Sequence, residues 1–201
     1  MIKHFQQIDF SSLLFEKIKV SADESVILPR FDSGDCPYFQ LPWVQLDYFG
    51  IPAKSKYFPT DKERTFIQIP IQGELLEKFR ELDEYIKTKM SESTPFDKYV
   101  YQPIVKEAMK GEFIKVKLQT NYETGNIETI MLKDGATIEG NETLPGFEQH
   151  IKRKSNIKAI IKLSSFWVMN KTYGASFKLM RVAVDDPKLE TINLDALDFF
   201  D

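Results

Sequence analysis

The chain has 201 residues, a formal net charge of -3, 42% hydrophobic and 28% charged residues, which is typical of a globular domain with a buried core. No apolar run approaches the ~18 residues of a membrane helix, and the N-terminus lacks the apolar stretch and cleavage site of a signal peptide, so we expect neither a membrane span nor secretion. Cys36 is the single cysteine and there are two histidines, His4 and His150, which excludes an internal disulfide, fits a reducing compartment and is too few for a common zinc site.

The N-terminal part of the chain predicts three strands before the first long helix. They cover residues 25–31, 38–44 and 65–71. Pro29 lies within the first of these strands and limits it to the edge of a sheet. Residues 48–59 are rich in Pro, Gly and aromatics and are expected to form a loop. Residues 8–18 are compatible with either a short helix or a strand.

Residues 73–90 predict one amphipathic helix. Apolar residues recur at helical spacing along one face, at Leu75, Phe79, Leu82 and Ile86. The exposed side is acidic, with Glu77, Glu81, Asp83 and Glu84. We expect this helix to pack across a sheet or to plug a barrel. Its acidic side argues against a helix that reads the major groove of duplex DNA.

The second half of the chain returns to strands separated by glycine-containing turns. The predicted strands cover residues 99–105, 113–118, 128–132, 156–163, 166–169 and 175–184. Many short strands and one helix predict a mainly β fold. Two architectures fit this pattern: a closed or partly closed β-barrel with the helix packed on it, or an antiparallel sandwich.

Charge is distributed unevenly along the chain. Residues 149–184 contain eight bases and no acid, whereas residues 185–201 contain six acids and one lysine. We therefore divide the chain into a folded domain, residues 1–184, and an acidic, aromatic-containing flexible C-terminal tail, residues 185–201. The alternative is that the bases form an ordinary solvated strand face and that the tail is a disordered end without a role.

Period-two alternation sorts the predicted strand faces. In residues 113–118 the apolar side chains point inward and leave Phe113, Lys115 and Lys117 outside, and Lys158 and Lys162 are likewise outside. Cations that follow phosphates and aromatic rings that stack on bases are what a single-stranded nucleic acid requires. The predicted nucleic-acid-binding residues are Phe113, Lys115, Lys117, Lys158, Lys162, Trp167, Tyr173, Lys178 and Arg181, with Trp43 and Tyr48 as weaker candidates. The alternative for each residue is an exposed lysine without a role or an aromatic ring in the core.

Three sequence blocks carry a family resemblance. They are residues 27–29 with Pro37-Tyr38-Phe39-Gln40-Leu41-Pro42-Trp43, residues 101–106 (Tyr-Gln-Pro-Ile-Val-Lys), and residues 158–163 with 166–168 and 173–179. In this order they resemble the single-stranded DNA-binding proteins of mimivirus- and phycodnavirus-like large DNA viruses. Those proteins are similar in turn to the replication single-stranded DNA-binding protein of short-tailed coliphages. The resemblance covers about residues 25–201.

The resemblance implies an OB-fold-like antiparallel β-barrel with a basic, aromatic DNA cleft and an acidic C-terminal tail. It implies a protein that binds and protects single-stranded DNA in replication, recombination or repair, without catalysis and without a cofactor. The same resemblance implies a host-cell location, in a cytoplasmic viral factory or the nucleus, and is compatible with a homodimer.

The C-terminal residues resemble the tail of that family but are fewer and less acidic, and they close on Asp201 instead of an aromatic. The implied role of the tail is to compete with DNA for the cleft and to dock a DNA polymerase or helicase. The residues that carry this role by resemblance are Asp195, Asp198, Phe199 and Phe200.

Two other classes of function compete with DNA binding. A metal-dependent nuclease could use the carboxylates of Asp32, Asp35 and Asp47 around a divalent ion. A structural or scaffolding β-protein of a virion or assembly could use the tail as a docking peptide. Cys36 is expected to be a small loop or core residue, since no base lies near it in sequence.

Overall fold

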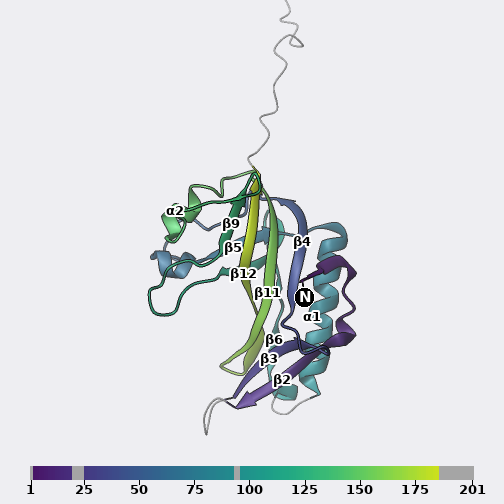
Figure 1. Ribbon diagram of the computed structural model, residues 1–201. Helices are drawn as coiled ribbons and strands as arrows, with labels where there is room; N and C mark the ends of the chain where they lie inside the picture. Colours follow the sequence, from purple (N-terminus) through teal and green to yellow (C-terminus); the bar gives the residue numbers. More distant parts are fainter. Residues whose placement is uncertain (1, 20–24, 93–95, 186–201) are drawn as a thin grey trace, which may run out of the picture.

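A long β-hairpin forms the centre of the fold (Figure 1). Its strands are β11 (Asn156–Met169) and β12 (Thr172–Asp185) in the computed structural model, which describes residues 2–19, 25–92 and 96–185. The turn residues Asn170 and Lys171 have φ of 50° and 59°, the left-handed pair that a two-residue hairpin turn requires. The predicted strands 156–163 and 166–169 are thus one continuous strand.

The other strands extend the sheet from both edges of this hairpin. The main path runs β1-β4-β11-β12-β8-β5. Its members beside the hairpin are β1 (Ile2–His4), β4 (Tyr38–Gln45), β8 (Gly111–Leu118) and β5 (Phe66–Pro70). Strands off this path are β2 (Leu13–Lys19), β3 (Ser25–Phe31), β6 (Val100–Gln102), β7 (Val105–Ala108), β9 (Ile130–Lys133) and β10 (Ala136–Thr137).

The mainly β prediction is confirmed, but the prediction of an antiparallel barrel is wrong in two respects. The pair β1–β4 and the pairs of β12 with β6, β8 and β9 are parallel, because long connections bring these strands back in the same direction. The sheet is also not closed by a strand pair. Its curl instead brings Gly50, beyond β4, to Gln68 of β5, where two backbone hydrogen bonds of 2.9 and 2.8 Å form an isolated bridge.

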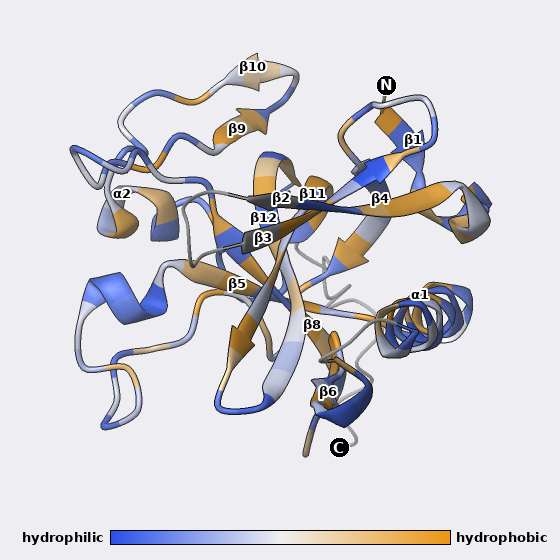
Figure 2. Cartoon of the chain, turned by 90° about the horizontal axis from the view of Figure 1, so that it is seen from below, coloured by the Kyte–Doolittle hydropathy of each residue, from blue (hydrophilic) through white to orange (hydrophobic). Residues whose placement is uncertain are grey.

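Helix α1 (Gly73–Ser91) lies on one side of the molecule, and α2 (Leu144–Glu148) lies on the other side, next to β9 and β10, which extend the sheet from β12 (Figure 2). The predicted apolar stripe of α1 is buried: Leu75, Phe79, Leu82 and Ile86. The Phe79 ring stacks on Phe5 with centroids 4.1 Å apart. Within the described residues, no helix is long and apolar enough to cross a membrane.

A buried carboxylate fastens α1 to the neighbouring strands. Asp83 accepts hydrogen bonds from the Tyr101 hydroxyl (2.6 Å) and from the backbone N–H groups of Ile104 (2.7 Å) and Val105 (3.1 Å). Burial raises the pKa of Asp83, an effect that these three bonds oppose. The Tyr-Gln-Pro-Ile-Val block therefore serves the fold here, as the partner of a helix residue.

Several local predictions need correction. Residues 99–105 do not form one strand: Tyr99 is a bend, residues 100–102 form β6, and β7 begins only at Val105. Residues 8–18 contain a 3-10 turn followed by β2, and α2 was not predicted. Helix α2 has local signals that explain it: Thr143 accepts the Gly146 N–H at its N-terminus, and Pro145 lies in its first turn. The 3-10 segments of the described residues are Phe5–Gln7, Phe10–Ser12, Asp61–Arg64 and Phe96–Lys98.

Candidate nucleic-acid interface

Strand register places three lysines in one line across the outer face of the sheet. Lys162 of β11 lies opposite Lys178 of β12, and Lys178 lies opposite Lys117 of β8. Tyr38 of β4 lies opposite Lys162 at one end, and Phe66 of β5 lies opposite Lys117 at the other. We call these five residues the lysine row. Because adjacent strands are ~4.8 Å apart, the row spans about 19 Å.

The cations of this face have no carboxylate partner among the described residues. No ion pair within 4.0 Å is formed there by Lys115, Lys117, Lys158, Lys162, Lys178 or Arg181. Like charges directly opposite each other on neighbouring strands destabilise a sheet. The row therefore carries positive charge that the described part of the chain does not neutralise.

Lys115 lies beside the row and is only partly hydrated. Its Nζ lies 3.8 Å from the centroid of the Phe66 ring, a cation–π distance. Partial burial lowers the pKa of Lys115, and the positive charges of Lys117 and Lys106 lower it further. A phosphate at this position would relieve that repulsion, so the site favours an anionic ligand.

The remaining predicted cations continue the same face. Lys158 lies opposite Trp43 of β4, whose side chain is 53% exposed. Arg181 lies opposite Ile160 of β11 and Ile130 of β9. An exposed indole next to a cation is a combination that single-strand binding uses, so Trp43 is better placed than its weak ranking in the sequence suggested.

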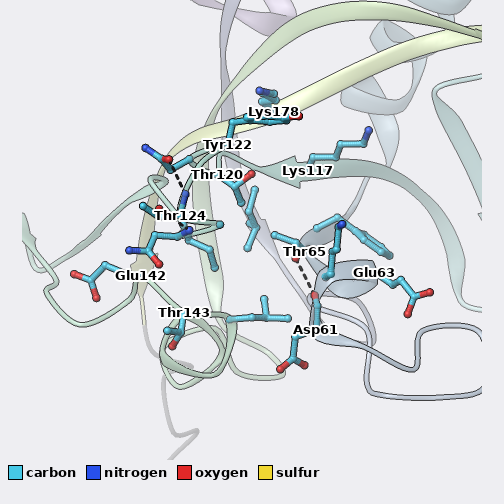
Figure 3. Close-up of a pocket in the computed structure, with 18 of the residues that line it drawn as sticks. Asp61, Glu63, Thr65, Lys117, Thr120, Tyr122, Thr124, Glu142, Thr143 and Lys178 are labelled. Carbon is cyan, nitrogen blue, oxygen red and sulfur yellow. Dashed lines mark hydrogen bonds between the residues drawn. The ribbon is translucent and has the colours of Figure 1, made fainter.

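A groove of about 880 Å³ opens at the end of the row (Figure 3). Lys115, Lys117 and Lys178 line it together with Phe66 and residues 120–127. Figure 3 shows Lys178, Tyr122 and Lys117 toward one side of the groove. Asp61, Glu63 and Glu142 lie toward the other side. The groove is thus cationic on the sheet side and carboxylate-bearing on the opposite side.

Buried Arg64 connects the two segments that form the carboxylate-bearing side of the groove, the 3-10 helix Asp61–Arg64 and helix α2. It donates to the backbone oxygen of Pro52 at 2.7 Å and to Asp61 at 2.8 Å, and it pairs with Glu148 of α2. A hydrogen bond from Lys54 lowers the pKa of Asp61, and Arg64 adds to this. The 3-10 segment and α2 are therefore fixed to each other, and the groove does not depend on a loose loop for this side.

Comparison with known proteins places the chain in no family: no protein-family model matches it, and no curated protein matches it. Among solved structures, the chain is similar to the single-stranded DNA-binding protein from bacteriophage Enc34, with 12% sequence identity and a TM-score of 0.45. The similar region covers 89% of this chain and 95% of that chain. The function proposed below rests on the lysine row and the groove themselves.

The structure corrects the prediction for Tyr173. Its side chain is 1% exposed and packs against the rings of Phe96 and Tyr101, so neither face of the ring is free for a base. Phe166 and Phe177, from the same hairpin, are also core residues. The alternative reading of these aromatics as core was therefore correct.

Trp167 and Phe113 are half-buried and lie apart from the groove. The Trp167 indole packs so closely over Gly174 that a Cβ added there would lie 2.6 Å from the ring. Trp167 is five residues beyond Lys162, about 17 Å along the strand. The Phe113 ring packs against Phe49, with centroids 5.3 Å apart. Both stay candidates for stacking, with one ring face already occupied by the protein.

The predicted partner-binding residues Asp195, Asp198, Phe199 and Phe200 lie outside the described residues. The carboxylates suggested for a nuclease, Asp32, Asp35 and Asp47, are not brought together: within residues 2–19, 25–92 and 96–185, no three His, Cys, Asp or Glu side chains are grouped to hold a metal. Cys36 is a partly exposed free thiol in the turn before β4.

Three site residues were missed at the level of sequence. Tyr38 and Phe66 end the lysine row, but each is adjacent in sequence to core residues, and only the register reveals its place. Tyr122 had a usable signal: it lies in the polar segment Asn121–Asn126, where an aromatic ring has no core to join.

Proposed function

We propose that the protein binds single-stranded DNA without catalysis, with the phosphates of the strand on the lysine row. The observation that carries this proposal is the line Lys162–Lys178–Lys117, whose cations have no ion-pair partner among the described residues. A polyanion supplies the missing negative charge, and counterion release makes its binding favourable at low salt.

Several features favour a single strand over a duplex. Reading duplex DNA by its major groove requires a helix or a two-stranded ribbon with free donors. The four cations of α1 are each paired with a carboxylate, which leaves that helix without free positive charge. The sheet face instead combines cations with the partly exposed ring of Tyr38 and the exposed ring of Trp43, the pattern that binds unstacked bases.

The row also costs stability, which supports a functional reason for it. Lys178 lies directly opposite a lysine on both neighbouring strands, and such like-charge pairs are destabilising. A bound phosphate backbone offsets this repulsion. On a strand face that binds no ligand, nothing would offset the repulsion between Lys178 and the lysines on its two neighbouring strands.

The acidic tail is proposed to have two roles, competition with DNA and docking of a protein partner. Residues 185–201 carry a net charge of -5 next to the basic block, so the tail is proposed to compete with DNA for the lysine row by mass action. Phe199 and Phe200 are the proposed anchors for a replication partner such as a polymerase or helicase, with Asp195 and Asp198 steering the encounter. The proposed setting is replication, recombination or repair in an infected host cell.

Titration of labelled single- and double-stranded oligonucleotides over a salt series tests this function. Single strands should bind more tightly than duplex, with little dependence on sequence, and affinity should fall with salt by a slope of about -0.7 per neutralised phosphate. Absence of any binding at low salt would favour a structural or scaffolding role. Equal affinity for duplex would overturn the single-strand proposal. Hydrolysis of the oligonucleotide in the presence of magnesium would favour the metal-dependent nuclease instead.

The same titration on a chain that ends at Asp185 tests the tail. Removing the acidic residues should tighten single-strand binding, most strongly at low salt, where charges are least screened. Unchanged affinity at low salt would contradict competition by the tail. Replacing Phe199 and Phe200 with Ala should leave DNA affinity intact while abolishing capture of a replication partner.

A further inference from the structure

Tyr122 is a fully exposed aromatic side chain in a well-fixed loop. Its relative exposure is 102%, and it lines the groove at the end of the lysine row. No ring contact or hydrogen bond of its side chain to another described residue is present. The ring therefore adds nothing to the packing of the described fold.

The loop that carries Tyr122 is held by its own side chains. Asn121 Oδ1 accepts the backbone N–H groups of Glu123 (2.9 Å) and Thr124 (3.1 Å), and Asn121 Nδ2 donates to Glu128 at 2.9 Å. An isolated bridge between Thr120 and Ile127 closes its base. The backbone position of Tyr122 is thus set before any ligand arrives, which lowers the entropic cost of using it as a contact.

The base of the loop is also tied to the strand that supplies Lys178. Buried Thr129 donates its hydroxyl to the backbone oxygen of Leu179 at 2.7 Å and accepts the Gln119 N–H at 2.9 Å. The base of the loop is therefore hydrogen-bonded to β12 directly after Lys178. Figure 3 shows Tyr122 and Lys178 toward the same side of the groove.

The charges of the groove set the side on which phosphates can lie. Lys117 and Lys178 offer attraction on the sheet side, whereas on the far side the carboxylates of Asp61, Glu63 and Glu142 outnumber the single cation Lys62. A strand whose phosphates lie on the lysine row must then direct some of its bases into the groove, where the exposed ring of Tyr122 is available. The volume of about 880 Å³ is of the size that accommodates small molecules, so bases have room to enter.

We propose that the groove is a base-binding subsite in which a nucleobase stacks on Tyr122 while its flanking phosphates contact Lys117 and Lys178. This inference rests on the proposed function and deepens it, because it assigns the base side of the DNA path. The subsite takes a planar base by its π-face, so it is tolerant of base identity.

Equilibrium binding of a labelled single-stranded oligonucleotide to Tyr122→Ala, Tyr122→Phe and Tyr57→Ala tests the subsite. Tyr57 is the matched control, since it is also an exposed loop tyrosine (74%) but does not line the groove. Tyr122→Ala should weaken binding about 5- to 150-fold. Tyr122→Phe should bind as the wild type, since the ring face is kept, and Tyr57→Ala should be unchanged. Full exposure of Tyr122 means that the fold should tolerate each variant.

An abasic oligonucleotide of the same length separates stacking from charge. It keeps the phosphates and removes the bases, so Tyr122→Ala and the wild type should bind it equally. Wild-type affinity of Tyr122→Ala for the normal strand would overturn the subsite while leaving the lysine row untouched. A loss that is equally large on the abasic strand would also overturn it, because the effect would not depend on a base. Failure of the wild type to bind any strand would instead overturn the proposed function.

Discussion

Cations on α1 and lysines on the sheet face have different electrostatic surroundings. On α1 the four cations each lie within 4.0 Å of a carboxylate three residues away: Lys78–Glu81, Arg80–Glu77, Lys87–Glu84 and Lys89–Glu92. On the sheet, Lys162, Lys178 and Lys117 lie next to one another and have no such partner among the described residues.

The exposed side of α1 is neutralised by its own ion pairs, whereas the sheet face keeps an excess of positive charge that an anionic ligand would neutralise. Pairs spaced by three residues neutralise the helix locally, and each contributes a few tenths of a kcal/mol to its stability. The lysine row does the opposite, since each lysine raises the free energy of its neighbours. The net charge of the chain therefore says little about its binding surface, whereas the local pairing of each cation distinguishes the face that we propose binds an anion.

Replacement of the buried residue Asp83 on α1 is expected to have the largest effect on stability. Asp83→Asn puts an amide where a carboxylate accepts three hydrogen bonds, and loss of a bond to a buried donor should lower the free energy of unfolding by about 1–3 kcal/mol. Urea unfolding of both proteins measures this. Glu84→Gln, on the exposed side, should change it little.

The pH dependence of that difference has a definite sign. Burial raises the pKa of Asp83 above 3.8 in the folded protein, so the stabilisation by Asp83 is complete at low pH and is lost as pH rises through the raised pKa. The advantage of the wild type over Asp83→Asn should therefore shrink as pH rises above about 4. An advantage that grows with pH would mean that the hydrogen bonds to the carboxylate outweigh its burial.

A smaller effect of opposite sign is expected from two matched lysine substitutions. Lys178→Gln removes two like-charge oppositions and should raise the free energy of unfolding by about 0.2–1 kcal/mol while weakening DNA binding. Lys87→Gln removes the pair with Glu84 and should lower stability by about 0.2–0.5 kcal/mol without changing DNA binding. Destabilisation by Lys178→Gln would show that this lysine serves the fold.

Local patterns in the sequence predicted the position and the apolar stripe of α1, because both depend on spacings of three and four residues within one helix. They were wrong for Asp83, which was predicted on the exposed side of the helix but is 6% exposed, because its burial depends on the strands that pack against it. Alternation likewise predicted that Lys115 and Lys117 point outward while Ile114 and Val116 are buried. Such features depend on a single element and need no knowledge of its neighbours.

Features that depend on register or on topology were beyond the sequence. The lysine row requires β12 to run parallel to β8 and antiparallel to β11, with register shifts after Ile160 and Leu163. These relationships join residues far apart in the chain, so no local pattern contains them. The error for Tyr173 has the same origin: its burial depends on Phe96 and Tyr101, which the long hairpin brings against it.

Replacing Lys117, Lys162 and Lys178 together with Gln, and measuring single-strand affinity over a salt series, tests the central claim most directly. The matched control replaces Lys17, Lys87 and Lys98 with Gln. It changes the net charge by the same amount, but at residues outside the lysine row and the groove. The row variant should bind more weakly, with a salt slope shallower by about 2, since three phosphate contacts are lost at about 0.7 each. The control should keep the wild-type slope. Equal slopes for the row variant and the wild type would contradict the assignment of the lysine row as the DNA-binding face.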